Sequence, residues 1–66
     1  MNMKLTRIKK GLTQSQLREK ANTSLNTIVA LEKGKINNIR VGTLVKIAAA
    51  LDSTVIELFF SSSDQE

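Results

Sequence analysis

Residues that start and end helices recur at short intervals along this chain. Gly11 and Gly34 readily take the left-handed backbone conformation that ends a helix, and Asn22 is the next best residue for it. Ser24 is a strong helix N-cap. Proline is absent, and β-branched residues do not alternate with polar ones, so no strands are expected. The chain is therefore restricted to short helices joined by tight turns.

Two capping-box patterns add further helix starts. In Thr13-Gln14-Ser15-Gln16 and in Thr54-Val55-Ile56-Glu57, the first and last side chains are spaced to satisfy each other's backbone amides. Together, the start and stop signals predict an all-α domain over residues 1–60 with helices at about 2–10, 14–21, 25–33, 41–51 and 55–60. The polar, low-complexity segment 61–66 is expected to be disordered.

The core is predicted from apolar residues at helical spacing. Outside the fourth helix it is expected to include Leu17, Ala21, Ile28, Leu31 and Phe59. The apolar stripe of the fourth helix is predicted to consist of Val41, Leu44, Val45, Ile47, Ala48 and Leu51.

The residue types that are missing exclude several functions. The 66 residues contain no Cys and no His, and no acid pair lies outside the cap and tail positions, so we expect neither an enzyme nor a metal or cofactor site. No apolar stretch reaches the length of about 18 residues needed to span a membrane, and the N-terminus lacks a signal sequence. A cytoplasmic protein without a small-molecule effector domain is expected.

Charge is divided unevenly along the chain. All ten basic residues lie in residues 1–50 with only two acids, Glu19 and Glu32, which gives +8, whereas residues 51–66 carry four acids and no base, which gives −4. A basic surface of this kind suits a polyanion such as nucleic acid, although Lys and Arg also simply solvate small domains. The predicted helices at 14–21 and 25–33, with their short connection, have the spacing of a helix-turn-helix, whose second helix enters the DNA major groove.

The chain also resembles a family. The resemblance covers about residues 3–60 and rests on the segments 5–14 (Leu-Thr-Arg-Ile-Lys-Lys-Gly-Leu-Thr-Gln) and 31–35 (Leu-Glu-Lys-Gly-Lys), with Leu17, Ser24, Thr27, Ile28, Thr43, Leu44, Lys46, Ile47, Ala48, Ala50, Leu51, Glu57, Leu58 and Phe59. This combination is similar to the Cro/CI-type helix-turn-helix of lambdoid phage repressors and of Xre-like bacterial regulators. It implies a compact five-helix, lambda-repressor-like fold and a sequence-specific DNA-binding regulator.

The resemblance also implies roles for individual residues. Positions that contact bases in the family are occupied by Leu25, Asn26, Thr27, Val29 and Ala30. Positions that contact DNA phosphates or border them are occupied by Gln14, Arg18, Ser24, Lys33, Lys35, Asn37, Asn38 and Arg40. Arg7 and Glu32 match positions that pair to brace the first helix against the third. Arg18 replaces a usual Ala between the two motif helices, so its guanidinium must extend outward.

The favoured function is a homodimeric transcriptional regulator that binds double-stranded DNA at an A/T-containing operator with two-fold symmetry. A repressor is favoured over an activator. Its dimer surface is predicted near the C-terminus, at Val55, Ile56 and Phe60, because this short helix carries more apolar residues than it can bury beneath itself. Ile36 and Ile39 in the loop are a second option for this surface. The alternative is a protein-interaction module of the antitoxin or anti-regulator type built on the same fold. Replacement of Asn26 distinguishes the two, since only a DNA reader needs its carboxamide.

Overall fold

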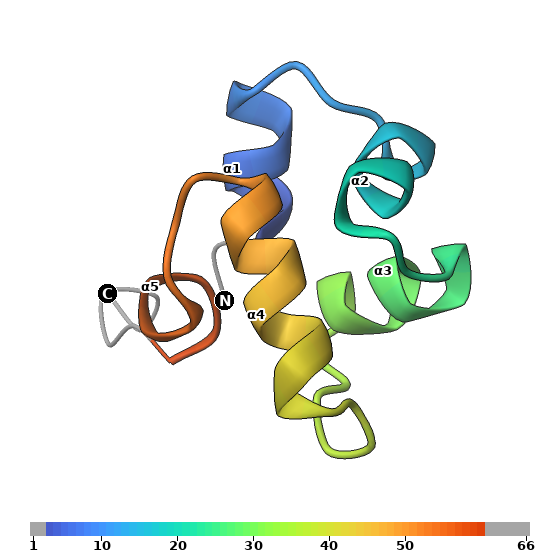
Figure 1. The fold of residues 1–66 in the computed structure, drawn as a ribbon, viewed down its shortest axis with the longest axis vertical. Helices are drawn as coiled ribbons and strands as arrows, with labels where there is room; N and C mark the ends of the chain where they lie inside the picture. Colours follow the sequence, from blue (N-terminus) through green and yellow to red (C-terminus); the bar gives the residue numbers. More distant parts are fainter. Residues whose placement is uncertain (1–2, 61–66) are drawn as a thin grey trace.

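The computed structural model describes residues 3–60, and within them the chain forms only helices, turns and loops. The five helices are α1 (Met3–Lys9), α2 (Gln14–Ala21), α3 (Leu25–Glu32), α4 (Val41–Ala50) and α5 (Val55–Phe59) (Figure 1). The predicted all-α, five-helix fold is confirmed, and each helix ends within a residue of its predicted limits. The predicted helical residue Asn2 and the segment 61–66 lie outside the described residues.

The predicted caps of α2 and α3 are present. Thr13 Oγ1 accepts a hydrogen bond from the Gln16 amide at 3.0 Å, and Gln16 Oε1 accepts one from the Thr13 amide at 2.8 Å, which completes the first capping box. Ser24 Oγ accepts from the Thr27 amide at 3.1 Å at the start of α3. Asn22 ends α2 in the left-handed conformation, with φ 55°. These local bonds define where the helices begin and end.

The second capping box is only half formed. Thr54 Oγ1 accepts from the Glu57 amide at 3.1 Å, as predicted. The Glu57 carboxylate, however, accepts from the hydroxyls of Thr54 and Ser53, both at 3.3 Å, and not from the Thr54 amide. Two nearby hydroxyl donors therefore replace the reciprocal backbone bond of this motif.

Helix α4 lies across the front of the molecule in Figure 1, with α1 behind it, and packs against both α2 and α5. The buried residues form one cluster, consisting of Met3, Leu17, Ala21, Ile28, Leu31, Leu44, Ile47, Ala48, Ala50, Leu51, Leu58 and Phe59. The prediction was wrong for Val41 and Val45, which are 70% and 51% exposed. They lie four residues apart on a flank of α4 that no described helix covers, so the buried stripe is narrower than predicted.

None of the described helices is long and apolar enough to cross a membrane.

Candidate nucleic-acid interface

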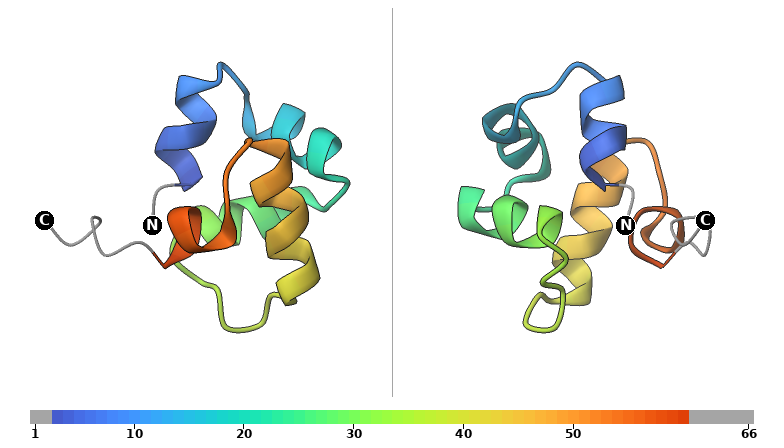
Figure 2. Two further views of the ribbon diagram at one scale, coloured as in Figure 1. Left: turned by 60° about the vertical axis from the view of Figure 1, so that its left-hand side comes forward. Right: turned by 180° about the vertical axis from the view of Figure 1, so that it is seen from behind.

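Helices α2 and α3 are neighbours in space and pack against each other (Figure 2). Leu17 on α2 and Ile28 and Leu31 on α3 are fully buried. The turn between the helices is closed by the Thr23 amide, which donates to the Arg18 carbonyl at 3.0 Å. Because both helices are anchored in this way, the side chains on their outer faces have defined positions relative to each other.

The outer side of α3 carries the residues predicted to contact bases. Leu25 and Asn26 are exposed, whereas Thr27, Val29 and Ala30 are half-buried. The Asn26 carboxamide makes no hydrogen bond to any residue from 3 to 60, so its donor and acceptor are available to a partner. The Thr27 hydroxyl, in contrast, shares a 2.8 Å hydrogen bond with the Ser24 hydroxyl. Asn26 is therefore the polar side chain of this surface best placed for recognition.

The loop after α3 carries polar and basic side chains around a shallow hollow. Gly34, with φ 84°, turns the chain away from α3, and Ile36 and Ile39 pack against the core. The hollow measures about 460 Å³ and is lined by Ala30, Gly34, Lys35, Asn37, Asn38 and Ile39. The predicted phosphate contacts Lys33, Lys35, Asn37, Asn38 and Arg40 are all exposed here. The loop is thus anchored by two isoleucines while its polar side chains face outward.

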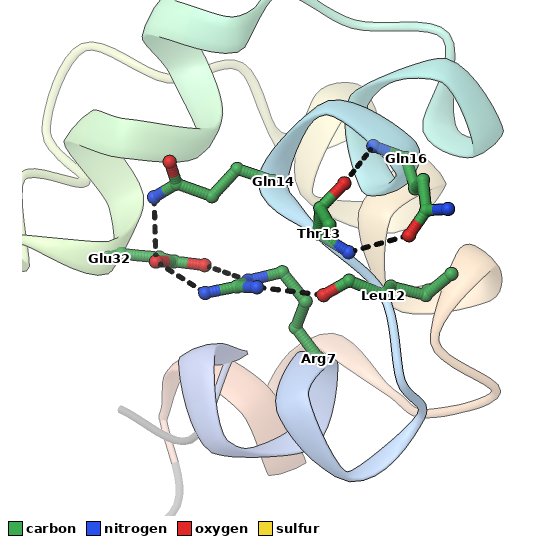
Figure 3. Close-up of polar contacts among 6 residues, drawn as sticks. All are labelled: Arg7, Leu12, Thr13, Gln14, Gln16 and Glu32. Carbon is green, nitrogen blue, oxygen red and sulfur yellow. Dashed lines mark hydrogen bonds and ion pairs between the residues drawn. The ribbon is translucent and has the colours of Figure 1, made fainter.

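A nearly buried ion pair joins α1 to α3 (Figure 3). Arg7 Nε donates to Glu32 Oε2 at 2.6 Å, Arg7 Nη2 contacts Glu32 Oε1 at 3.3 Å, and Arg7 Nη1 donates to the Leu12 carbonyl at 2.8 Å. The predicted pairing of Arg7 with Glu32 is confirmed. Its side chains are only 11% and 6% exposed, which makes this a near-buried pair linking α1 to α3.

Gln14 also takes part in this network. Its Nε2 donates to Glu32 Oε1 at 3.0 Å, across 18 positions of the sequence. The sequence predicts only a phosphate contact for Gln14 and gives no signal for this bond, because no local pattern relates the start of α2 to the end of α3. The phosphate contact itself stays a prediction.

The remaining charges leave the α2–α3 side basic. Glu32 is paired with Arg7, and Asp52 is paired with Lys10 at 3.2 Å. Arg18 is half-buried and, like Lys33, Lys35 and Arg40, forms no ion pair with another of residues 3–60. Positive charge near the motif is therefore available for a polyanion.

The predicted dimer residues on and after α5 differ in exposure. Ile56 and Phe60 are 70% and 60% exposed, whereas Val55 is half-buried against the core. Phe59 is buried, as predicted. Any apolar contact made by this end of the protein therefore depends mainly on Ile56 and Phe60.

A protein-family model described as "Helix-turn-helix" matches residues 3–58, which is most of the chain and includes all of α2 and α3. No curated protein and no solved structure matches the chain significantly.

Proposed function

Since the chain belongs to the Cro/CI-type, Xre-like helix-turn-helix family of DNA-binding transcriptional regulators, we propose that it binds an A/T-containing, two-fold-symmetric operator as a homodimer and represses transcription. The observation that carries this proposal is the exposed carboxamide of Asn26 in the first turn of α3, which makes no hydrogen bond to another of residues 3–60. Such a regulator acts on the genome, so we place it in the cytoplasm.

The chemistry of the α3 surface suits A·T base pairs. A carboxamide pairs with both N6 and N7 of adenine in the major groove, and apolar groups contact the thymine methyl. Asn26 supplies the carboxamide, and Leu25, Val29 and Ala30 supply apolar groups. No Arg or Lys lies in α3 to pair with guanine. The operator half-site is therefore expected to contain A·T pairs opposite Asn26.

The basic and polar groups around α3 are proposed to hold the DNA backbone. Lys33, Lys35 and Arg40 neutralise phosphates beyond the end of α3, with Asn37 and Asn38 donating from the same loop. Gln14, Arg18 and Ser24 contact phosphates from α2 and the turn. Each phosphate neutralised by a basic side chain makes binding more sensitive to salt.

A dimer is proposed because one motif contacts too few base pairs to find a single site in a genome. Two motifs related by a two-fold axis contact half-sites about one helical turn apart. We place the dimer contact at Ile56 and Phe60, with Val55 at its edge. Repression is proposed over activation because a bound dimer excludes RNA polymerase sterically, without further contacts.

Replacing Asn26 with alanine is expected to lower the preference for the operator over its variants by about 1–3 kcal/mol, because the paired hydrogen bonds to one adenine are lost. The matched control is Asn37→Ala in the loop, which should weaken binding to all duplexes alike, since phosphate contacts carry no sequence information. Affinities for duplexes substituted at each operator position measure both effects. If Asn26→Ala leaves the sequence preference unchanged, α3 does not recognise bases through this residue. That result would favour the alternative function, a protein-interaction module.

Replacing Phe60 with serine is expected to weaken self-association by about tenfold or more, because an exposed aromatic at the centre of a contact carries much of its free energy. Stability of the monomer should change by less than about 0.5 kcal/mol, since Phe60 is 60% exposed. The control is Ile8→Ser on α1, where the side chain is 53% exposed. Sedimentation equilibrium measures the effect, and equal loss of association in both variants would contradict a contact at this end of the protein.

A further inference from the structure

The hydrogen bond between Gln14 and Glu32 is not needed to satisfy the buried carboxylate of Glu32. Arg7 already supplies Glu32 with donors to both carboxylate oxygens, so the buried charge is satisfied without Gln14. The Gln14 carboxamide nevertheless points to Glu32, and its Nε2 lies 3.0 Å from Oε1 (Figure 3). Gln14 is the first residue of α2, on the side proposed to meet the DNA backbone. The contact therefore joins a structural ion pair to a side chain that is proposed to contact DNA.

We infer that Glu32 is a positioning residue for DNA binding, which holds the Gln14 carboxamide so that an N–H group of Nε2 is available to a phosphate. This inference rests on the proposed function of Gln14 as a phosphate contact. The two ends of a carboxamide have nearly the same shape, but one donates hydrogen bonds and the other only accepts them. A phosphate also only accepts, so binding needs the nitrogen end in a defined place.

The Glu32 carboxylate determines which end of the Gln14 carboxamide faces it. An ionised carboxylate accepts hydrogen bonds and donates none, so it is compatible with Nε2 of Gln14 and repels Oε1. Nε2 carries two N–H groups, of which Glu32 takes one and leaves the other for an outside acceptor. Because Glu32 is 6% exposed, its bond to Gln14 is little weakened by water. Arg7 neutralises the carboxylate, which limits its repulsion of a nearby phosphate.

Fixing Gln14 in advance lowers the cost of binding. A flexible glutamine loses rotational freedom when it contacts a phosphate, whereas a side chain already held by Glu32 has less freedom to lose. Without that bond, the affinity for DNA is expected to fall about fivefold. Simple charge predicts the opposite sign, since removing a negative charge near the DNA favours binding. The two explanations are therefore separable.

The test is a double-mutant cycle of Glu32→Gln and Gln14→Ala, with a mixed-sequence duplex of about 20 base pairs as the probe at low salt. Glu32→Gln should lower the affinity for the duplex about fivefold more when Gln14 is present than it does in the Gln14→Ala background. Glu32→Gln leaves the buried Arg7 guanidinium without a carboxylate, so binding is compared at a temperature where circular dichroism shows all four proteins to be folded. An effect of charge alone then appears in both backgrounds and cancels. The matched control Glu19→Gln removes an exposed charge from α2 and should show no such coupling. Equal effects of Glu32→Gln in the two backgrounds would overturn the inference.

A second measurement needs no variant and so does not depend on the folding of Glu32→Gln. The side-chain NH₂ group of Gln14 in the unmodified protein should be as rigid as the backbone, with an NMR order parameter of about 0.8, whereas the exposed carboxamide of Asn26 should be below about 0.6. A mobile Gln14 side chain would contradict the positioning role. If the unmodified protein does not bind the duplex at all, the proposed DNA contact of Gln14 fails instead, whatever the NMR result.

Discussion

Replacing Arg7 with alanine should leave most of the protein unfolded at physiological temperature. The substitution removes both donors from Glu32, whose carboxylate is only 6% exposed and retains just the Gln14 amide. Breaking a buried ion pair on one side costs about 3–5 kcal/mol, because the other charge stays buried without its partner. In a domain of fewer than about 70 residues the core supplies a total stability of only about 3–5 kcal/mol, so this loss is comparable to the whole. Urea unfolding followed by circular dichroism measures the loss.

The surface pair provides the control for this prediction. Lys10 and Asp52 also form an ion pair, at 3.2 Å, but the Asp52 side chain is 78% exposed. Lys10→Ala should therefore cost less than about 1 kcal/mol. A double variant, Arg7→Met with Glu32→Leu, should recover much of the stability lost in Arg7→Ala, since it leaves no unpaired charge. Similar losses in Arg7→Ala and Lys10→Ala would contradict the structural role of the buried pair.

Replacing Leu17 with alanine is expected to destabilise the fold by about 3 kcal/mol and to weaken DNA binding in proportion to the loss of the folded fraction. Leu17 is fully buried, and α2 buries only one other residue, Ala21. Truncating a buried leucine removes apolar contacts and leaves a cavity, at a cost of about 2–5 kcal/mol. With so few anchors on α2, the structure has little means of filling that cavity.

The matched control is the same substitution on the surface. Leu5 on α1 is 61% exposed, so Leu5→Ala should change stability by less than about 0.5 kcal/mol. Thermal unfolding of both variants, with duplex binding measured on each, separates loss of the fold from loss of contacts. A Leu17→Ala variant as stable as Leu5→Ala would show that α2 is not held by this side chain.

The order and limits of the helices follow from local chemistry, which is why the sequence predicts them well. Thr13, Ser24 and Asn22 act through bonds and backbone angles within a few residues of themselves. Gly11 and Gly34 take positive φ, as their positions after helices indicate. Asp52, with φ 53°, ends α4 in the same way but was not predicted, because Asp adopts this conformation less readily than Gly or Asn.

Features that depend on distant packing were predicted less well. Val41 and Val45 have the helical spacing of core residues, yet the sequence does not say how much of α4 its neighbours cover. The pairing of Arg7 with Glu32 was available only through the family resemblance. The bond from Gln14 to the same carboxylate had no signal at all, since it depends on how the ends of α2 and α3 meet.

The most direct test of the proposed function is to incubate the purified protein with a library of random DNA duplexes at near-physiological salt and to sequence the DNA that it retains. The proposal predicts an A/T-containing consensus with two-fold symmetry and half-sites about one helical turn apart. Retained DNA with no consensus, together with binding that disappears on modest addition of salt, would contradict it and reduce the basic face to a non-specific polyanion surface.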